Sequence, residues 1–325
     1  MKIRVLSRKE IAAALDMPTA IAAMREAFRS LSDGTAHAPT RLSMDTPGGV
    51  ALFMPGRVGN ERVAAKLVSV NLDNPERYGL PAIHAAIAVF DPRTGALKAL
   101  LEGEWLTALR TGAGGGLAAD LMACPQAGTV ALFGAGVQAR TQLDAVRCVR
   151  EVREVRVFTL DDTGRTLARE IEASDSGLEA RAARTPEEAL AGADLVIAAT
   201  TSPTPVFDGS LVEDGAHVTG IGSFTPEMAE VDATLVARAR IVVDQRAGAM
   251  AEAGDILQPL AAGVIDESAV VGELGDVVAG RVPGRTRPDE ITFFKSVGNA
   301  VQDVAVAHLA LVQAEEAGLG TVLSL

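Results

Sequence analysis

The spacing of hydrophobic residues changes twice along this chain. Near the N-terminus, Ile21, Met24, Phe28 and Leu31 recur every three or four residues. This spacing predicts a helix with one face in a core, and Gly34 marks its end. Between residues 41 and 101 the apolar runs become short and are separated by turn residues. The runs at 41–44, 50–54, 63–70, 82–90 and 97–101 predict an antiparallel sheet, because no helix lies between them.

From residue 128 onward, apolar strands alternate with helical segments. We expect strands at 130–133, 155–160, 178–182, 194–199, 218–221 and 241–244, with helices beginning near 137, 164 and 186. This order predicts a parallel, doubly wound sheet that binds ligands at the carboxyl ends of its strands. A small-residue helix at 113–122 precedes this region, led in by residues 107–112. A strand and turn at 290–298 and a helix at 299–317 follow it.

Composition narrows the classes of function. The chain has 325 residues, enough for about two domains, and 48% of them are hydrophobic. A net charge of −12 and 3% aromatic residues argue against nucleic-acid binding. Cys124 and Cys148 match no metal-ligand spacing, so we expect no metal and a reducing compartment. No apolar run would suit a signal peptide or a membrane span, so we expect a cytoplasmic protein without membrane contact.

The segment from Gly128 to Arg140 carries the clearest binding motif. The run 130–133 leads into Gly134-x-Gly136-x-x-Ala139, at the start of a predicted helix. Glycines permit a tight turn and close approach of a phosphate, and the helix N-terminus attracts negative charge. The pattern predicts a dinucleotide site. A tight turn without a ligand, or a site for another adenosine cofactor, remains open.

Three cations are candidates for binding a substrate carboxylate. Arg41 begins a predicted strand, Lys66 lies within an apolar run, and Arg110 precedes the junction of the two regions. Arginine binds carboxylates through two parallel hydrogen bonds, and a lysine in an apolar strand is costly unless it is paired. Surface salt bridges are the alternative interpretation for each of them.

Three further residues have more than one possible role. His84 could donate a proton near neutral pH or be a structural histidine. Asp303 could balance an arginine or complement a helix dipole. Asp161 follows the second strand of the nucleotide region and would suit a ribose hydroxyl, although it also suits a turn. The sequence does not decide between NADH and NADPH.

Together these segments resemble the ornithine cyclodeaminase/mu-crystallin family over nearly the whole chain. The matching segments are 107–111, 134–139, 192–196, 199–203, 215–218, 222–226 and 294–298. The resemblance implies an α/β fold, with a Rossmann domain at 119–299 inserted into an α+β substrate domain formed by 1–118 and 300–325. It also implies a homodimer formed through the mainly antiparallel sheet of the substrate domain.

The resemblance and the residues considered above together give the two parts of the expected site. The resemblance itself supplies the three carboxylate-binding cations and the cofactor contacts Gly136, Val137, Gln138, Thr200, Ser202, Val297 and Gly298. The substrate carboxylate would be bound by Arg41, Lys66 and Arg110, with Asp303 and Phe224 also on the substrate side. Catalysis would depend on Lys66, Arg110 and His84. The expected contacts to NADPH or NADH are Thr111, Gly134, Gly136, Val137, Gln138, Asp161, Thr200, Thr201, Ser202, Val297 and Gly298.

One departure from the family pattern narrows the expected reaction. True ornithine cyclodeaminases have an aspartate at the position of Phe224, and an active-site glutamate that is absent near Leu52. Phenylalanine cannot bind an ammonium group. We therefore expect an NAD(P)H-dependent reductase of a cyclic imino acid, Δ1-pyrroline-2-carboxylate or Δ1-piperideine-2-carboxylate. The alternatives are ornithine cyclodeamination, alanine-type dehydrogenation, and a non-catalytic binder of NADP(H) or a small ligand.

Overall fold

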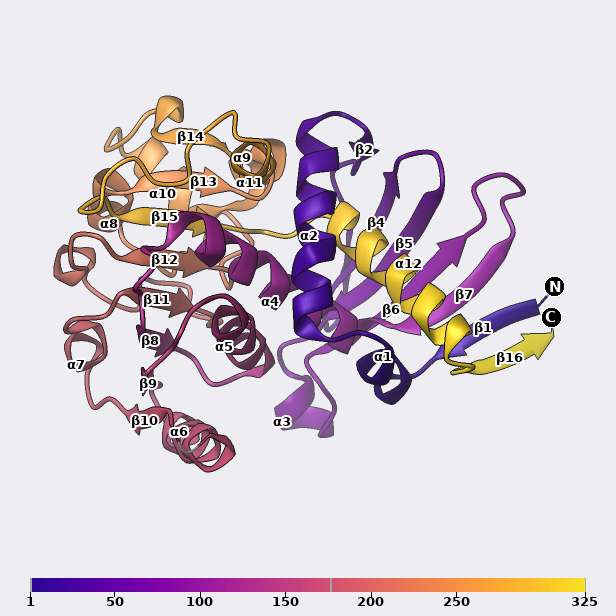
Figure 1. Ribbon diagram of the computed structural model, residues 1–325, viewed down its shortest axis with the longest axis horizontal. Coiled ribbons are helices and arrows are strands. Elements are labelled where there is room, and N and C mark those ends of the chain that lie inside the picture. Colours follow the sequence, from indigo (N-terminus) through magenta and orange to yellow (C-terminus); the bar gives the residue numbers. More distant parts are fainter. Residues whose placement is uncertain (1, 176, 325) are drawn as a thin grey trace. The chain divides into compact units, whose positions relative to one another are not determined.

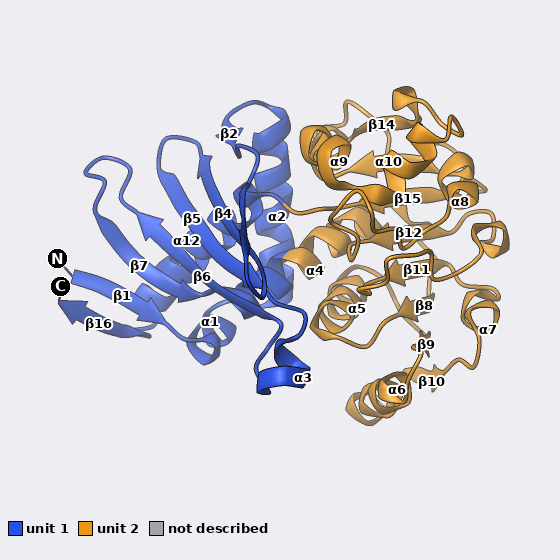
Figure 2. Cartoon of the chain, turned by 180° about the vertical axis from the view of Figure 1, so that it is seen from behind, with its two compact units in different colours: residues 1–110, 299–325 blue, residues 111–298 orange. Residues whose placement is uncertain are grey.

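The chain forms two compact units in the computed structural model, which describes residues 2–175 and 177–324. One unit contains the residues up to Arg110 together with those from Asn299 onward, and the other contains Thr111–Gly298 (Figure 2). Helix α4 (Gly103–Met122) passes from the first unit into the second. The boundary expected from the sequence, between residues 118 and 119, lies within this same helix.

The first unit is built on an eight-stranded, mainly antiparallel sheet (Figure 1). Its strand order is β16-β1-β7-β6-β5-β4-β2, with β3 paired to β4. Among the described residues of this sheet, β1 and β7 form the one parallel pair. The strands are β1 (Lys2–Leu6), β2 (Ala36–His37), β3 (Leu42–Thr46), β4 (Gly49–Val58), β5 (Arg62–Val70), β6 (Ile83–Phe90), β7 (Leu97–Glu102) and β16 (Thr321–Ser324). The predicted antiparallel region is confirmed, whereas β1, β2 and β16 were not predicted.

Helices cover one face of this sheet. Figure 1 shows α12 (Ala300–Glu316) lying along the strands, and it contacts β4, β5 and α2 (Met17–Ser32). The approach is close, because a Cβ atom added at Gly56 would lie 2.9 Å from the Cβ of Ala300. Two shorter helices complete the unit, α1 (Arg8–Ala14) and α3 (Asn74–Tyr78).

Side-chain alternation along β5 separates the two faces of the sheet. Ala64 and Lys66 are buried, and Lys66 contacts Asp303 of α12. Leu67 is 45% exposed, because successive side chains of a strand point to opposite faces. Leu42 and Phe53 occupy positions directly in register with Leu67. These three residues therefore share the face away from α12.

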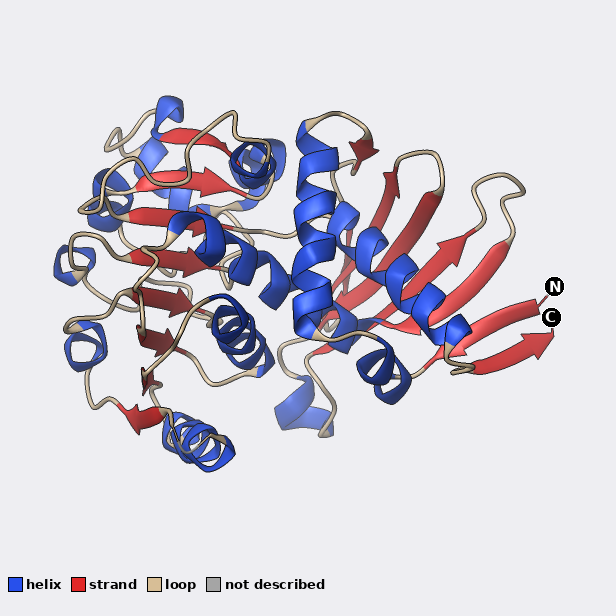
Figure 3. Ribbon diagram, in the orientation of Figure 1, coloured by secondary structure: helices blue, strands red, loops and turns tan. Residues whose placement is uncertain are grey.

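The second unit contains a parallel sheet covered on both faces. Its strand order is β10-β9-β8-β11-β12-β15-β13-β14 (Figure 1), as predicted for a doubly wound fold, and helices flank the strands (Figure 3). The strands are β8 (Thr129–Phe133), β9 (Glu154–Phe158), β10 (Glu179–Ala182), β11 (Leu195–Ala198), β12 (His217–Gly220), β13 (Arg240–Val243), β14 (Val270–Glu273) and β15 (Thr292–Lys295). In β8, Val130 and Leu132 join one hydrophobic core and Ala131 and Phe133 the other.

Seven α-helices lie wholly within the described part of this unit. They are α5 (Val137–Val149), α6 (Thr163–Ser174), α7 (Pro186–Leu190), α8 (Ala233–Arg238), α9 (Arg246–Glu252), α10 (Gly254–Ala261) and α11 (Leu274–Val278). Two single 3₁₀ turns, η1 (Gly209–Leu211) and η2 (Glu267–Ala269), lie in loops. None of the helices in the described ranges is long and apolar enough to cross a membrane.

Helix α4 begins earlier than the sequence suggested. Residues 107–112, expected to precede a helix, lie inside it, and the helix starts at Gly103. The reason is the Glu102 carboxylate, which accepts hydrogen bonds from the backbone N–H of Glu104 at 2.7 Å and of Trp105 at 3.1 Å. It therefore satisfies donors that a helix start leaves open. Further along, a Cβ at Gly116 would lie 2.7 Å from that of Ala145 on α5.

Candidate functional site: a buried cation cluster and a glycine turn

The first unit contains a buried group of charges on the helix-covered face of its sheet. The Nζ atom of Lys66 lies 2.9 Å and 3.1 Å from the two carboxylate oxygens of Asp303. The Nε atom of Arg110 lies 3.1 Å from Oδ1 of the same carboxylate. All three residues are at most 6% exposed. One carboxylate thus holds two cations, so the group carries a net positive charge.

Gln302 fixes the orientation of Arg110. The Nη1 atom of Arg110 donates a hydrogen bond of 2.8 Å to Oε1 of Gln302, which is adjacent to Asp303 on α12. A guanidinium has five N–H groups, and these two contacts occupy one at Nε and one at Nη1. The pair of nitrogens Nη1 and Nη2 keeps N–H groups that suit the two oxygens of a carboxylate.

The charges in this group alter one another's protonation. Burial, opposed by Asp303 and reinforced by Arg110 and Arg41, lowers the pKa of Lys66 from 10.5 to about 8. Burial raises the pKa of Asp303, but the charges of Lys66 and Arg110 outweigh it, so this pKa lies below its ordinary value. Asp303 is therefore ionised at neutral pH. Of the three cations expected from the sequence, Lys66 and Arg110 share the Asp303 carboxylate, and Arg41 has a smaller effect than Arg110 on the pKa of Lys66.

His84 is not part of this group. It lies directly opposite Ser69 in the register of β5 and β6, whereas Lys66 lies opposite Ile87. Residues 66 and 69 of one strand point to opposite faces, so His84 lies on the face away from Asp303. Its Nδ1 atom lies 3.1 Å from Oε1 of Glu104. The structure therefore does not place His84 beside Lys66 or Arg110.

The glycine motif of the second unit forms the predicted turn between β8 and α5. Gly134 has φ +103°, and a Cβ there would lie 2.5 Å from the carbonyl oxygen of Ala199. Gly136 is the N-cap of α5, and a Cβ there would meet no atom within 4 Å. No side chain caps α5, and the buried Oε1 atom of Gln138 accepts no hydrogen bond. The space beside Gly136 and the free N–H groups at the start of α5 suit the phosphates of a dinucleotide, and the Gln138 oxygen could accept a hydrogen bond from it.

The other predicted cofactor residues lie at the carboxyl ends of neighbouring strands. Thr200, Thr201 and Ser202 follow β11, and Val297 and Gly298 follow β15. Val137 is the exposed first residue of α5, and the Thr111 carbonyl accepts a hydrogen bond from Nε2 of Gln142 at 2.9 Å. Phe224 is half-buried in the loop after β12. The parallel sheet thus gathers most of the expected contacts at one edge.

Asp161 occupies the turn between β9 and α6. Its Oδ1 atom accepts hydrogen bonds from the backbone N–H of Thr163, at 3.0 Å, and from the Thr163 hydroxyl. These hydrogen bonds lower the pKa of the Asp161 carboxyl. The neighbouring Leu160 is 98% exposed. The turn role considered in the sequence is therefore present, and Asp161 stays a candidate for the ribose because its carboxylate is exposed.

Sequence reasoning missed three buried charges near this edge. The side chains of Glu230, Asp255 and Lys295 are fully buried. The Nζ atom of Lys295 lies 2.6 Å from Oδ2 of Asp255. The sequence could have indicated that Lys295 is buried, because this residue ends the apolar strand β15. A charge at such a position requires a partner. The partner is 40 positions away in the printed sequence, so no local pattern reveals it.

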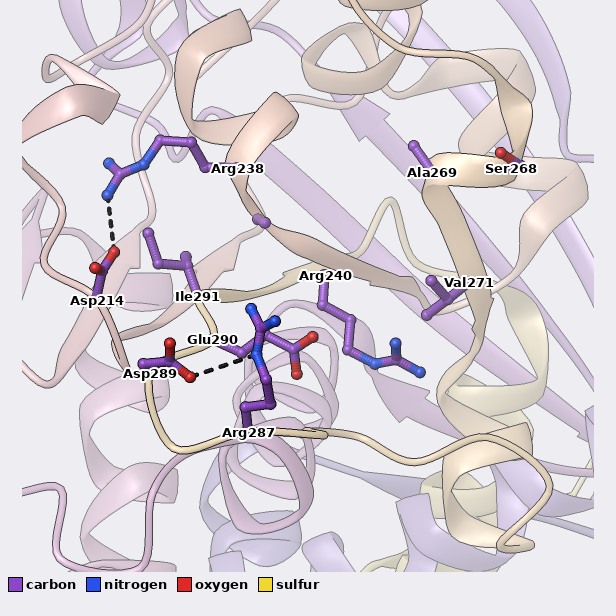
Figure 4. A pocket seen from close by; sticks show the side chains of 11 residues that line it. Asp214, Arg238, Arg240, Ser268, Ala269, Val271, Arg287, Asp289, Glu290 and Ile291 are labelled. Carbon is purple, nitrogen blue, oxygen red and sulfur yellow. Dashed lines mark hydrogen bonds and ion pairs between the residues drawn. The ribbon is translucent and has the colours of Figure 1, made fainter.

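A cavity of about 430 Å³ lies elsewhere in the second unit (Figure 4). It is lined by Arg238, Arg240, Arg287, Asp214 and Asp289, among others. Arg240 begins β13, so the cavity lies at the amino ends of the strands, away from the glycine turn. Its arginines contact carboxylates or carbonyl oxygens, as Figure 4 shows for Arg238 with Asp214 and Arg287 with Asp289. No trio of metal-binding side chains occurs in residues 2–175 and 177–324.

Comparison with known proteins places this arrangement in a family. Residues 1–317 match the sequence profile of the ornithine cyclodeaminase/mu-crystallin family. The chain belongs to this family. It is 33% identical over 321 residues to a Δ1-pyrroline-2-carboxylate reductase of Bacillus cereus, covering 97% of this chain and 98% of that protein. The family resemblance inferred from the sequence is therefore confirmed.

Two solved structures superpose closely on the chain. The Thermococcus litoralis Δ1-pyrroline-2-carboxylate reductase, in complex with NADH and L-proline, has a TM-score of 0.95 and 37% identity, covering 98% of this chain and 99% of that one. An archaeal alanine dehydrogenase dimer with bound NAD has a TM-score of 0.93 and 32% identity, covering 100% and 99%. The predicted fold class is confirmed.

Proposed function

We propose that the chain reduces the C=N bond of a cyclic imino acid, Δ1-pyrroline-2-carboxylate or Δ1-piperideine-2-carboxylate, to L-proline or L-pipecolate. The observation that carries this proposal is the buried group of Lys66, Arg110 and Asp303. It combines a net positive charge with guanidinium N–H groups suited to a carboxylate. A small, planar imino acid offers one carboxylate and no second charged side chain.

The class of enzyme and its cofactor follow from the relatives. Reductases that act on C=N bonds, and structures with NADH or NAD bound, resemble the chain over 97–100% of its length. The chain is an oxidoreductase that uses a nicotinamide cofactor. Gly136 and the N-terminus of α5 would hold the pyrophosphate, and Gln138, Thr200 and Ser202 would contact other parts of the dinucleotide. When bound, the cofactor supplies a hydride.

The residues of the chain bind and orient the substrate. Arg110 and Lys66 would bind the carboxylate, and Arg41 adds positive charge nearby. Asp303 holds both cations in place and keeps the group from carrying three uncompensated charges. If the substrate enters as the iminium, its nitrogen already carries the required proton. Hydride addition to the carbon then gives the neutral amine, so no side-chain acid is required and His84 has no part in this scheme.

Phe224 supports the reductase over the cyclodeaminase. It lies in the loop after β12, where the cyclodeaminase pattern has an aspartate. An apolar ring suits the methylene carbons of a pyrroline or piperideine ring, whereas an ammonium group beside it would lose its hydration without a partner. Alanine-type dehydrogenation is the second candidate, because an alanine dehydrogenase superposes on the chain and pyruvate imine shares the same carboxylate and C=N bond.

The test is NADH and NADPH oxidation with a panel of substrates. Pyrroline-2-carboxylate and piperideine-2-carboxylate should be reduced at least tenfold more efficiently than pyruvate with ammonia, and ornithine should give no proline. Greater efficiency with pyruvate and ammonia would support the dehydrogenase instead. Tight NADPH binding without turnover of any substrate would support the non-catalytic binder. Replacing Arg110 by Ala should reduce kcat/KM by roughly 30-fold or more, which corresponds to the 2 kcal/mol or more of a buried charge contact.

We also infer a homodimer formed through the exposed face of the first unit's sheet. Leu42 is 65% exposed and Leu67 45% exposed, and the register places both beside Phe53 on that face. Contiguous apolar side chains on one sheet face are typical of a protein interface. A second copy of the chain would cover this face, and the archaeal alanine dehydrogenase, itself a dimer, supports self-association.

A further inference from the structure

The Glu230 side chain joins two loops at the carboxyl edge of the parallel sheet. Its Oε1 atom accepts hydrogen bonds from the backbone N–H of Thr200 at 2.6 Å and from the Thr200 hydroxyl at 2.9 Å. Its Oε2 atom accepts from the backbone N–H of Gly222 at 2.5 Å and of Ser223 at 3.3 Å. Thr200 follows β11, and the other two residues follow β12. One carboxylate therefore sets the spacing of two loops.

The backbones of the two loops pack tightly against each other at Gly222. A Cβ at Gly222 would overlap the carbonyl oxygen of Thr200 and lie 2.5 Å from Oε1 of Glu230. Glu230 is fully buried, so water cannot replace its carboxylate as an acceptor. The donors it satisfies are mostly backbone N–H groups, which cannot turn away. The loop conformation thus depends on an acceptor at each of two oxygen positions.

A second buried pair holds Glu230 itself. Oδ1 of Asp255 accepts hydrogen bonds from the backbone N–H of Glu230 at 2.6 Å and of Val231 at 3.0 Å. Oδ2 of Asp255 lies 2.6 Å from Nζ of Lys295, the last residue of β15. The charges form a chain from the loop after β11 to the end of β15. None of these three residues has a role in the reaction scheme above.

The Thr200 loop also borders the glycine turn. The Ala199 carbonyl is the group that a Cβ at Gly134 would approach, and the Ala199 N–H donates to the Phe133 carbonyl at 3.0 Å. A shift of the loop after β11 would therefore move the backbone that packs against Gly134, in the turn that the dinucleotide requires. We propose that Glu230 is a positioning residue for the nicotinamide cofactor, which holds the Thr200 and Gly222 loops in their binding conformation. This inference rests on the nicotinamide site proposed above.

The direct test replaces Glu230 by Gln. The amide places an NH₂ group against backbone donors that must then lose their acceptor, while volume and shape are kept. The dissociation constant of NADH, measured by its fluorescence without any substrate, should rise by about tenfold or more. The control is Glu227→Gln, an exposed glutamate of the same segment, which should bind NADH as the wild type does. Thermal unfolding without NADH reports any loss of fold separately.

A milder variant covers the case in which Glu230→Gln does not fold. Glu230→Asp keeps the charge but draws the carboxylate back by one methylene from the donors of Thr200 and Gly222. We expect NADH binding to weaken by about threefold or more in this variant. Amide hydrogen exchange at residues 200 and 222 should also become faster in Glu230→Asp without NADH.

Two results would overturn the positioning role. One is an unchanged NADH dissociation constant in a folded Glu230→Gln protein. The other, where that protein does not fold, is wild-type NADH affinity in Glu230→Asp. If the wild-type chain itself does not bind NADH or NADPH, the proposed cofactor fails instead, and this outcome is visible before any variant is made.

Discussion

Lys66 and Asp303 form a buried ion pair although 237 positions separate them in the sequence. One lies on a central strand of the first unit's sheet and the other on α12, which returns to this unit after the whole second unit has been completed. The pair therefore links the two segments that make up the first unit. It also supplies the counter-charge that lets Lys66 and Arg110 be buried together.

Replacing Asp303 by Asn should destabilise the fold strongly. Two buried cations would lose their counter-charge, and breaking a buried pair from one side costs about 3–5 kcal/mol in free energy of unfolding. Urea denaturation measures this loss. The control is Glu315→Gln, which removes the partly exposed contact with Arg4 and should change stability by at most about 1 kcal/mol. Equal losses in the two variants would show that Asp303 does not hold the cations.

The pKa of Lys66, about 8, predicts opposite pH trends for stability and substrate binding. Between about pH 8 and 10.5 the native state has lost a proton that the unfolded state keeps. Rising pH therefore increases the contribution of Lys66 to stability in this window, relative to Lys66→Met. In the same window the neutral amine no longer attracts a carboxylate, so the KM for the imino acid should rise.

Lys66→Arg is the matched variant for this pH dependence. Arginine stays charged throughout the range, so the rise in KM above about pH 8 should disappear or move to higher pH. The measurement is KM for pyrroline-2-carboxylate from pH 6.5 to 10, at saturating NADH. An identical alkaline limb in both proteins would assign the titration to the substrate iminium or to another group.

Alanine at Gly134 should lower the stability of the fold, whereas alanine at Gly136 should lower the affinity for NADH. Gly134→Ala forces a Cβ against the Ala199 carbonyl at a positive φ, so it should cost about 1–3 kcal/mol of stability. Gly136→Ala meets no atom in the protein, so its thermal unfolding should be unchanged. It should nevertheless weaken NADH binding by about tenfold, because the methyl group occupies the space of a phosphate. Normal NADH affinity in Gly136→Ala would place the pyrophosphate elsewhere.

The exposed sheet face of the first unit predicts the effect of surface charges on assembly. Leu42→Glu together with Leu67→Glu would set carboxylates among the apolar side chains of that face, and the dimer should dissociate at micromolar concentration. Sedimentation velocity measures the change. Val264→Glu, at an equally exposed position of the second unit, should leave the dimer intact. A wild-type chain that sediments as a monomer would contradict the inferred interface.

Much of the fold could be predicted because local patterns encode it. The alternation of strands and helices after residue 128 and the short apolar runs before residue 101 each have a period that sequence alone displays. Strands β2 and β16 could not be predicted in this way, because they are only two and four residues long, and the residues of β16 are exposed. The early start of α4 depends on one side chain, Glu102, capping backbone groups ahead of it.

The residues of the candidate site likewise fall into those that a local sequence pattern indicates and those that only the fold reveals. Lys66 was singled out because a charge in an apolar strand needs a partner, and the structure supplies that partner as Asp303. His84 was a candidate by residue type alone, and only the strand register shows that it lies on the other face. Glu230 had no local signal, because the groups it joins, Thr200 and Gly222, are brought together by the fold.

The most direct test of imine reduction follows the hydride itself. The chain is incubated with pyrroline-2-carboxylate and NADH carrying deuterium at both C4 positions of the nicotinamide, and the product is examined by NMR. Reduction of the C=N bond predicts L-proline with one deuterium at Cα and one NADH consumed per proline formed. Proline without deuterium at Cα, or NADH consumption only when pyruvate and ammonia are supplied, would contradict it.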